Sequence, residues 1–169
     1  MKKTHFSQAD IYAEAVWKLV KLRKLTGVVS VYLATEDPLA KDLLETSFKK
    51  VLESDSDRKN GENQPQRVTE FKIYLDATVS VYLENGLRPG NIDPTKGRGF
   101  YIDIDIANKS KGLYGLQVMA SLVIALESDD YVLTTTSNFS RLINEIRKNI
   151  INPRFGNRTE LIDLDTGEW

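Results

Sequence analysis

The segment YVLTTTSNFSR, residues 131–141, contains the change from strand to helix that decides the fold. Three apolar or aromatic residues are followed by five small hydroxyl and amide side chains, and a helical pattern of apolar residues then runs to residue 150. Ser137 and Asn138 are residue types that cap helices. Because the first N–H groups of a helix lack internal partners and lie at its positive end, the pattern predicts an anion-binding turn. An ordinary helix cap without a ligand is the alternative, and this segment alone favours it.

The rest of the chain alternates helices with strands. Residues 28–34 are β-branched and largely apolar, without alternation, which is typical of a strand buried on both faces of a parallel sheet. The predicted helices occupy residues 8–25, 39–52, 113–126 and 141–150. The predicted strands occupy residues 28–34, 71–75 with 79–83 as a candidate continuation, 100–106 and 131–133. This order predicts an α/β fold, a Rossmann-like and mostly parallel sheet with helices on both faces and residues 131–133 as a central strand.

We expect residues 1–169 to form a single domain, because this length suits one domain or one half of a two-domain enzyme. Residues 54–68 contain almost no apolar side chain, so we expect a solvated loop there, with a composition typical of disorder.

Composition argues against several classes of function. A formal net charge of −1 is unlike that of a dedicated nucleic-acid binder, and the basic residues near both ends, including Arg147 and Lys148, are typical of solvated helix faces. The chain has no cysteine and one histidine, so thiolate zinc sites and cysteine nucleophiles are excluded. No apolar run approaches the roughly 20 residues of a membrane span, and the first residues do not resemble a signal peptide.

Glu36 and Asp37 directly follow the predicted buried strand, at the edge where parallel sheets bind ligands. Their carboxylates suit hydrogen bonds to sugar hydroxyls, and acidic capping of the next helix is an equally good interpretation. Since the carboxyl ends of parallel strands meet at one edge, we expect the turns at residues 35–37 and 134–137 to border one cleft.

Two Asp-X-Asp patterns resemble a metal-binding motif, but their positions argue against a metal site. Asp103 and Asp105 alternate with isoleucines, which places both on the solvent face of the predicted strand at residues 100–106. Asp163 and Asp165 near the terminus are a weaker candidate still. We therefore expect no metal site.

Three parts of the chain resemble the α1,6-fucosyltransferases, which transfer fucose from GDP-fucose to the core of N-glycans. Residues 31–38, VYLATEDP, resemble that family's VYLATDDP segment. Phe6 and Tyr12 keep the spacing of the Phe and Tyr that open its preceding helix. Residues 131–141 resemble a family strand that ends in CTFSSQ and is followed by an Arg.

The resemblance implies that this chain is the carboxyl-terminal, GDP-fucose-binding half of a GT-B-type catalytic domain. It also implies that the reaction needs no metal and no cofactor, with GDP-fucose as the donor substrate. It implies partners in the form of this sugar nucleotide and a glycan acceptor, with location in the Golgi lumen for a eukaryotic enzyme and in the cytoplasm otherwise. Donor phosphate binding would fall to Thr134, Thr136, Ser137 and Asn138, with Arg141 as a further candidate, and positions associated with activity would be Tyr12, Glu36 and Asp37.

Departures from the family are equally informative. Its HXRRTDK segment, with phosphate-binding arginines and the catalytic base beyond it, would precede Met1, so the catalytic residue in this chain is unknown. The family's guanine-reading Asp falls near Ser121 or Leu122. A truncated fucosyltransferase is therefore one hypothesis. The alternatives are a non-catalytic module that binds sugar nucleotides or glycans, and an unrelated α/β domain with an acidic site, such as a nuclease.

Overall fold

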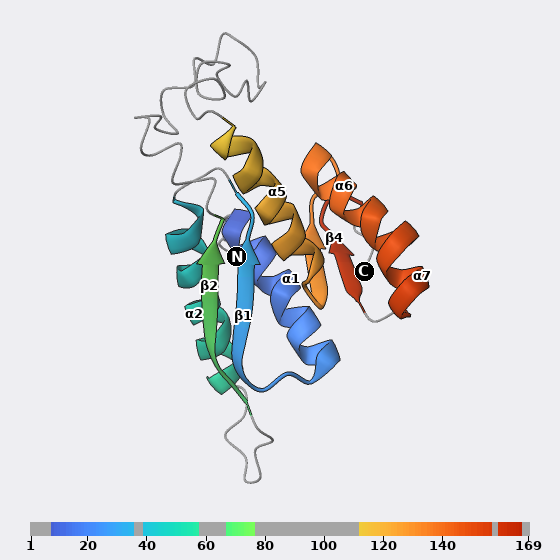
Figure 1. Cartoon of the computed structure of the whole chain (residues 1–169). Coiled ribbons are helices and arrows are strands. Elements are labelled where there is room, and N and C mark those ends of the chain that lie inside the picture. The colour runs from blue at the N-terminus through green and yellow to red at the C-terminus, as the bar shows by residue number, and fades with distance from the viewer. Residues whose placement is uncertain (1–7, 36–38, 58–66, 77–111, 157–158, 167–169) are drawn as a thin grey trace.

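The computed structural model describes residues 8–35, 39–57, 67–76, 112–156 and 159–166. These ranges contain helices and strands in alternation (Figure 1). The helices are α1 (Gln8–Arg23), α2 (Ala40–Asp57), α5 (Leu113–Leu126), α6 (Asn138–Ile146), the π-helical turn η2 (Arg147–Ile151) and α7 (Asn152–Phe155). The strands are β1 (Gly27–Leu33), β2 (Val68–Leu75), β3 (Asp130–Leu133) and β4 (Glu160–Asp163).

The strands form two small parallel sheets. β1 pairs with β2 from Gly27 to Leu33, and β3 pairs with β4 from Asp130 to Leu133. The arrows of β1, β2 and β4 point the same way in Figure 1. The predicted α/β class with parallel strands is confirmed. The expectation of a central position for residues 131–133 is wrong for the described strands, because β3 hydrogen-bonds only to β4 among them.

Strand side chains alternate between two layers of helices. Val31 and Leu33 of β1 pack with α1 and α2, whereas Tyr32 between them packs with α5 and α6. The same alternation occurs in β3, where Tyr131 faces α5 and α6 while Val132 faces α1. Since successive strand residues point to opposite faces, both small sheets are covered on two sides. Helices on both faces of the sheet are therefore confirmed.

Helix α1 contacts both sheets. Ala13 packs against Phe48 and Ile73 beside the first sheet, and Ala15 packs against Ile162 of the second. Both alanines are fully buried, and their short side chains let the helix backbone approach closely. At its end, Arg23 donates to Asp130 through Nε at 3.1 Å and Nη2 at 2.8 Å, which ties α1 to the start of β3.

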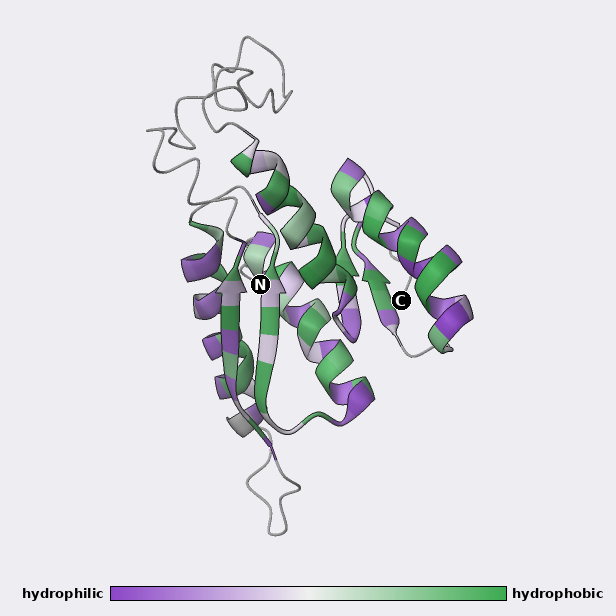
Figure 2. Cartoon of the chain, in the orientation of Figure 1, coloured by the Kyte–Doolittle hydropathy of each residue, from purple (hydrophilic) through white to green (hydrophobic). Residues whose placement is uncertain are grey.

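Helix α5 is apolar around most of its circumference (Figure 2). Ala125 and Leu126 pack against β3, but Leu116 is 70% exposed and Val123 is 56% exposed. A helix that is apolar all round is usually buried. The described residues therefore leave one apolar face of α5 uncovered.

Several predicted boundaries need correction. Helix α2 continues to Asp57 and β2 begins at Val68, so both ends of the predicted loop at residues 54–68 belong to regular elements, and residues 58–66 lie outside the described residues. The predicted strands at 79–83 and 100–106, with Asp103 and Asp105, also lie outside them. Strand β4 was not predicted, because its two apolar residues stand between carboxylates and form no apolar run of the kind that predicted β3.

Phe48 is the large side chain buried most completely in the cluster that α1 and α2 form with the β1–β2 sheet. It is 2% exposed and stacks on Phe71 with ring centroids 4.1 Å apart. We expect Phe48→Ala to lower the free energy of unfolding by about 3–5 kcal/mol, because it removes buried area and leaves a cavity. Urea denaturation measures the loss. The control is Leu22→Ala on α1, where the leucine is 63% exposed and a change within about 0.5 kcal/mol is expected. Equal losses for the two variants would contradict this assignment of the core.

Candidate functional site

The turn between β3 and α6 has the predicted form. β3 ends at Leu133 and α6 begins at Asn138, with Ser137 as the N-cap in extended conformation (φ −75°, ψ 132°). The Ser137 N–H donates to the Thr134 carbonyl at 2.9 Å, and the Arg141 N–H donates to the Ser137 carbonyl at 3.0 Å, which closes the first helical turn. The prediction that Asn138 lies in the first turn of this helix is confirmed.

The first turn of α6 has no side-chain cap from Ser137. The Asn138 side chain instead accepts a hydrogen bond from Arg141 Nη2, so the guanidinium lies beside the start of the helix. Within the described part of the chain, the initial N–H groups of α6 therefore remain available for an external acceptor. Arg141 adds positive charge at the end of the helix where the dipole is already positive, an arrangement that favours an anion.

Two aspartates of the chain accept hydrogen bonds from Thr135 and Thr136, the turn residues that precede Ser137. Thr135 donates to Asp163 through its N–H at 3.3 Å and its hydroxyl at 2.5 Å. Thr136 donates to Asp165 Oδ2 through its N–H at 2.7 Å and its hydroxyl at 2.8 Å. The N–H and hydroxyl donors of Thr135 and Thr136 therefore bind carboxylates of the chain itself. Thr136 as a phosphate ligand stays a prediction, and in this structure its N–H and hydroxyl are engaged by Asp165.

The Asp163 carboxylate is held ionised by these contacts. Burial opposes ionisation, but hydrogen bonds from the Thr135 hydroxyl, from the backbone N–H groups of Asp165 and Thr135 and from the Thr166 hydroxyl outweigh it, and the pKa of Asp163 is lowered. Hydrogen bonds to a carboxylate favour its charged form. Asp163 therefore joins the end of β4 to the turn as an anion.

Tyr12 and Thr134 come together across the fold. The Tyr12 hydroxyl of α1 donates to Thr134 Oγ1 at 3.4 Å, although the two residues are 122 positions apart. Thr134 accepts this bond through its oxygen, so its own hydroxyl hydrogen remains free to donate. Glu36 and Asp37 lie outside the described residues, and so does most of the turn at residues 35–37 that we expect at the same edge.

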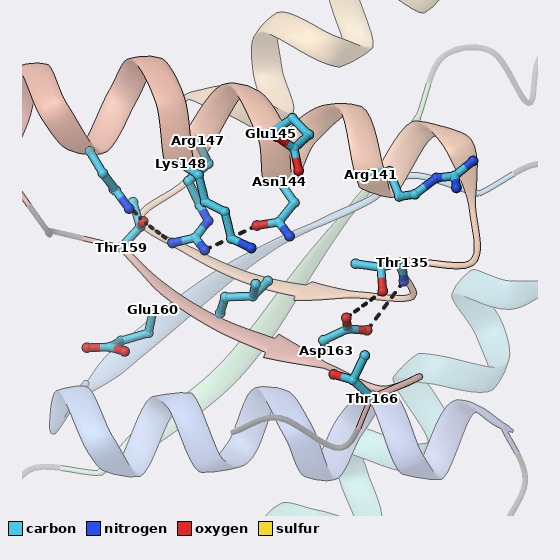
Figure 3. Close-up of a pocket in the computed structure, with 12 residues that line it drawn as sticks. Thr135, Arg141, Asn144, Glu145, Arg147, Lys148, Thr159, Glu160, Asp163 and Thr166 are labelled. Carbon is cyan, nitrogen blue, oxygen red and sulfur yellow. Dashed lines mark hydrogen bonds between the residues drawn. The ribbon is translucent and has the colours of Figure 1, made fainter.

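A pocket of about 660 Å³ lies between the α6–η2 helix and β4 (Figure 3). One end holds Thr135, Arg141 and Asp163, and the other end holds Arg147 and Thr159. Its lining is mostly charged and polar, with side chains contributed by both the helix and the strand. The pocket therefore begins at the predicted anion turn and continues along the helix away from it.

Arg147 lines this pocket, and the sequence analysis did not predict that it is buried. Basic residues of this region were expected on solvated faces, but Arg147 is only 7% exposed. The helical pattern continues through residue 150, yet the backbone widens into a π-helical turn at Arg147. A sequence pattern with a period of 3.6 residues contains no signal for that change.

A second polar cluster lies at the carboxyl end of β2. Ser121 of α5 donates to Asp76 Oδ1 at 2.6 Å, and both residues are buried. The pKa of the neighbouring Tyr32 hydroxyl is raised, mainly because the hydroxyl is buried. Ser121, one of the positions opposite the family's guanine-reading Asp, is therefore engaged with a carboxylate supplied by β2.

Within the residues that the structure describes, no three or more carboxylate or histidine side chains cluster as metal ligands would. None of the described helices combines the length and apolar character that a membrane crossing requires. Comparisons of the chain with models of protein families, with curated proteins and with solved structures find no match.

The lowered pKa of Asp163 predicts how stability depends on acid. A carboxyl group with a lowered folded pKa stabilises the fold above its unfolded value, ordinarily 3.8, and loses that contribution as the pH falls through the folded value. We expect Asp163→Asn to be less stable than the parent chain at about pH 7, and to lose less stability between about pH 5 and pH 2.

Denaturant unfolding at both ends of this range measures the effect. Asp129→Asn is the matched control, because Asp129 is exposed on the loop before β3. It should follow the parent chain at every pH. An unchanged acid-dependent loss in Asp163→Asn would show that other carboxyl groups cause it.

Proposed function

We propose that this chain is a sugar-nucleotide-binding α/β domain, the donor half of a fucosyltransferase-type glycosyltransferase. The observation that carries the proposal is the contact between the Tyr12 and Thr134 hydroxyls. These residues belong to two of the three segments that resemble the α1,6-fucosyltransferases, and they meet although they are distant in sequence. A shared site explains why both segments keep the family pattern.

Support for a donor phosphate comes from the start of α6. Its initial N–H groups, the hydroxyls of Thr134 and Ser137, and the Arg141 guanidinium surround the positive end of the helix. A helix N-terminus of this kind favours phosphate oxygens. Asn138 contributes by orienting Arg141 through its side-chain oxygen. Relative to the sequence prediction, the proposed ligand set excludes Thr136, whose donors are taken by Asp165.

Transfer would then proceed by attack of a glycan hydroxyl on fucose with departure of GDP. The chain's contribution to that reaction is donor binding and stabilisation of charge on the departing diphosphate. The resemblance assigns the base that accepts the hydroxyl proton to the family's HXRRTDK region, which none of the matching residues covers, so we assign no base to this chain. Tyr12, Glu36 and Asp37 are proposed to act on the sugar side of the donor.

The aspartates of the turn favour a second candidate function. Asp163 and Asp165 already satisfy Thr135 and Thr136, and their negative charges repel a diphosphate. A non-catalytic module that binds a sugar nucleotide or glycan weakly fits this arrangement. The two functions differ in turnover: a donor-binding half of a fucosyltransferase would support fucose transfer when combined with a segment that carries the catalytic base, whereas a binding module would not.

We expect GDP to bind the chain with a dissociation constant on the order of 1 mM, equivalent to about −4 kcal/mol. Two or three charge-assisted hydrogen bonds contribute about 1.5–3 kcal/mol each, and they must offset an association cost of about 4–15 kcal/mol. Amide NMR titration should show the largest shifts at Asn138 and its neighbours in α6. Ser137→Ala and Arg141→Gln should each weaken binding several-fold.

Because the Ser137 hydroxyl makes no cap hydrogen bond, its removal tests ligand contact without removing a helix cap. Arg154→Gln is the matched control, since Arg154 is also exposed on a helix but lies in the last turn of α7. Micromolar affinity for GDP, or affinity unchanged in both test variants, would contradict binding at the start of α6.

Asp165→Asn tests the competition between the turn's own carboxylates and the ligand. The asparagine oxygen can still accept from the Thr136 N–H, but the negative charge is gone. We expect GDP affinity to rise about twofold to fivefold, because removal of one exposed like charge is a modest effect. The same titration measures it, and Asp129→Asn controls for net charge. Weaker binding would mean that the carboxylate organises the site rather than opposes it.

A further inference from the structure

Arg147 carries a buried positive charge with neutral partners. Its Nη1 donates to Thr159 Oγ1 at 3.1 Å and its Nη2 donates to Asn144 Oδ1 at 3.2 Å. The guanidinium carbon lies 6.0 Å from the centre of the Tyr131 ring, within range of a cation–π contact. These groups orient the guanidinium, but none of them carries a negative charge.

No carboxylate of the described residues forms an ion pair with Arg147. Its Nε is buried and has no hydrogen-bond partner among them. Arg23, by comparison, is paired with Asp130 at 2.8 Å. Burying an arginine without a counter-charge is costly, and such charges in proteins are ordinarily paired. The environment of Arg147 is therefore incomplete in a way that an anion would correct.

The pocket supplies room and further donors beside this charge. Lys148 is the next residue on the π-helical turn, and Figure 3 shows its side chain extending into the space between the helix and the strands, as does that of Arg147. The Glu160 carboxylate is directed away from the guanidinium in the same view. Asn152 also lines the pocket, and its Oδ1 accepts from the Thr159 hydroxyl at 3.2 Å, which leaves its amide hydrogens to donate.

The two terminal nitrogens of Arg147 carry four hydrogens, of which the contacts with Thr159 and Asn144 use two. Together with the Lys148 ammonium and the Asn152 amide, they place donors from η2 and α7 around one end of the pocket. Two positive charges and several donors match a group with nearly two negative charges and three terminal oxygens. A planar carboxylate with one charge would leave part of this set unused.

We propose that Arg147, Lys148 and Asn152 form a binding site for a phosphate group. This site is separate from the start of α6, because Arg147 follows Asn138 by nine positions along the helix, a rise of about 13.5 Å. The proposal does not depend on the sugar-nucleotide function. π-Helical turns often occur at functional sites, and η2 here aims two consecutive basic side chains at one pocket.

Thermal unfolding in inorganic phosphate, against sodium chloride of equal ionic strength, tests the site. With a dissociation constant on the order of 1 mM, about 20 mM phosphate should raise the melting temperature by roughly 4–7 °C. Arg147→Met should abolish the shift. Lys148→Gln, at an exposed position where folding is not at risk, should weaken phosphate binding about tenfold. Arg154→Gln should behave as the parent chain.

A direct measurement is the NMR signal of the Arg147 side-chain Nε–H, which should move on addition of phosphate and stay in place on addition of acetate. If Arg147→Met does not fold, Lys148→Gln and this signal decide the question. Equal stabilisation by phosphate of the parent chain and Lys148→Gln would overturn the proposal. So would equal effects of acetate and phosphate, or a shift lost in Arg141→Gln but retained in Lys148→Gln, since phosphate would then bind only at the start of α6.

Discussion

Among the described residues, the fold depends on one helix, α1, that packs against two sheets too small to be stable alone. A two-stranded sheet in isolation is marginal in water, and the described strands form two of them. Helix α1 joins the two because Ala13 and Ala15 bring it against separate clusters of strand side chains. The bond between Arg23 and Asp130 fixes the same helix to the second sheet at its other end. The Tyr12 contact with Thr134, and hence the candidate site, follows from that placement of α1.

The two ends of the pocket differ in whether the chain itself supplies a counter-charge. At the end near the turn, donors of Thr135 and Thr136 meet carboxylates supplied by the chain. At the other end the positive charge of Arg147 meets only neutral groups among the described residues. Asp163 accepts hydrogen bonds from Thr135 donors that a ligand would otherwise bind. No carboxylate of the described residues pairs with Arg147 in this way. The second end of the pocket is therefore the one at which an external anion would relieve the larger electrostatic cost.

Part of the site could be predicted because local patterns control it. The apolar run before Thr134 predicted β3, and Ser137 and Asn138 predicted where α6 begins, since N-cap preferences act within one helical turn. The occupants of the turn could not be predicted in this way. Asp163 and Asp165 are 28 and 29 residues from their threonine partners. Asp163 ends the four-residue strand β4, and Asp165 lies in the turn after it. β4 lacks the apolar run that predicted β3, and its pairing with β3 depends on tertiary contacts.

The sequence by itself determined the α/β class, the parallel strands, the helices on both faces and the helix start at Asn138, because hydrophobic periodicity and capping are local properties of the chain. Only the tertiary structure decided that Thr135 and Thr136 bind Asp163 and Asp165, that Tyr12 reaches Thr134, and that Arg147 is buried rather than solvated. Each of these depends on which distant segments pack together, and that cannot be read from the spacing of residues along one helix or strand.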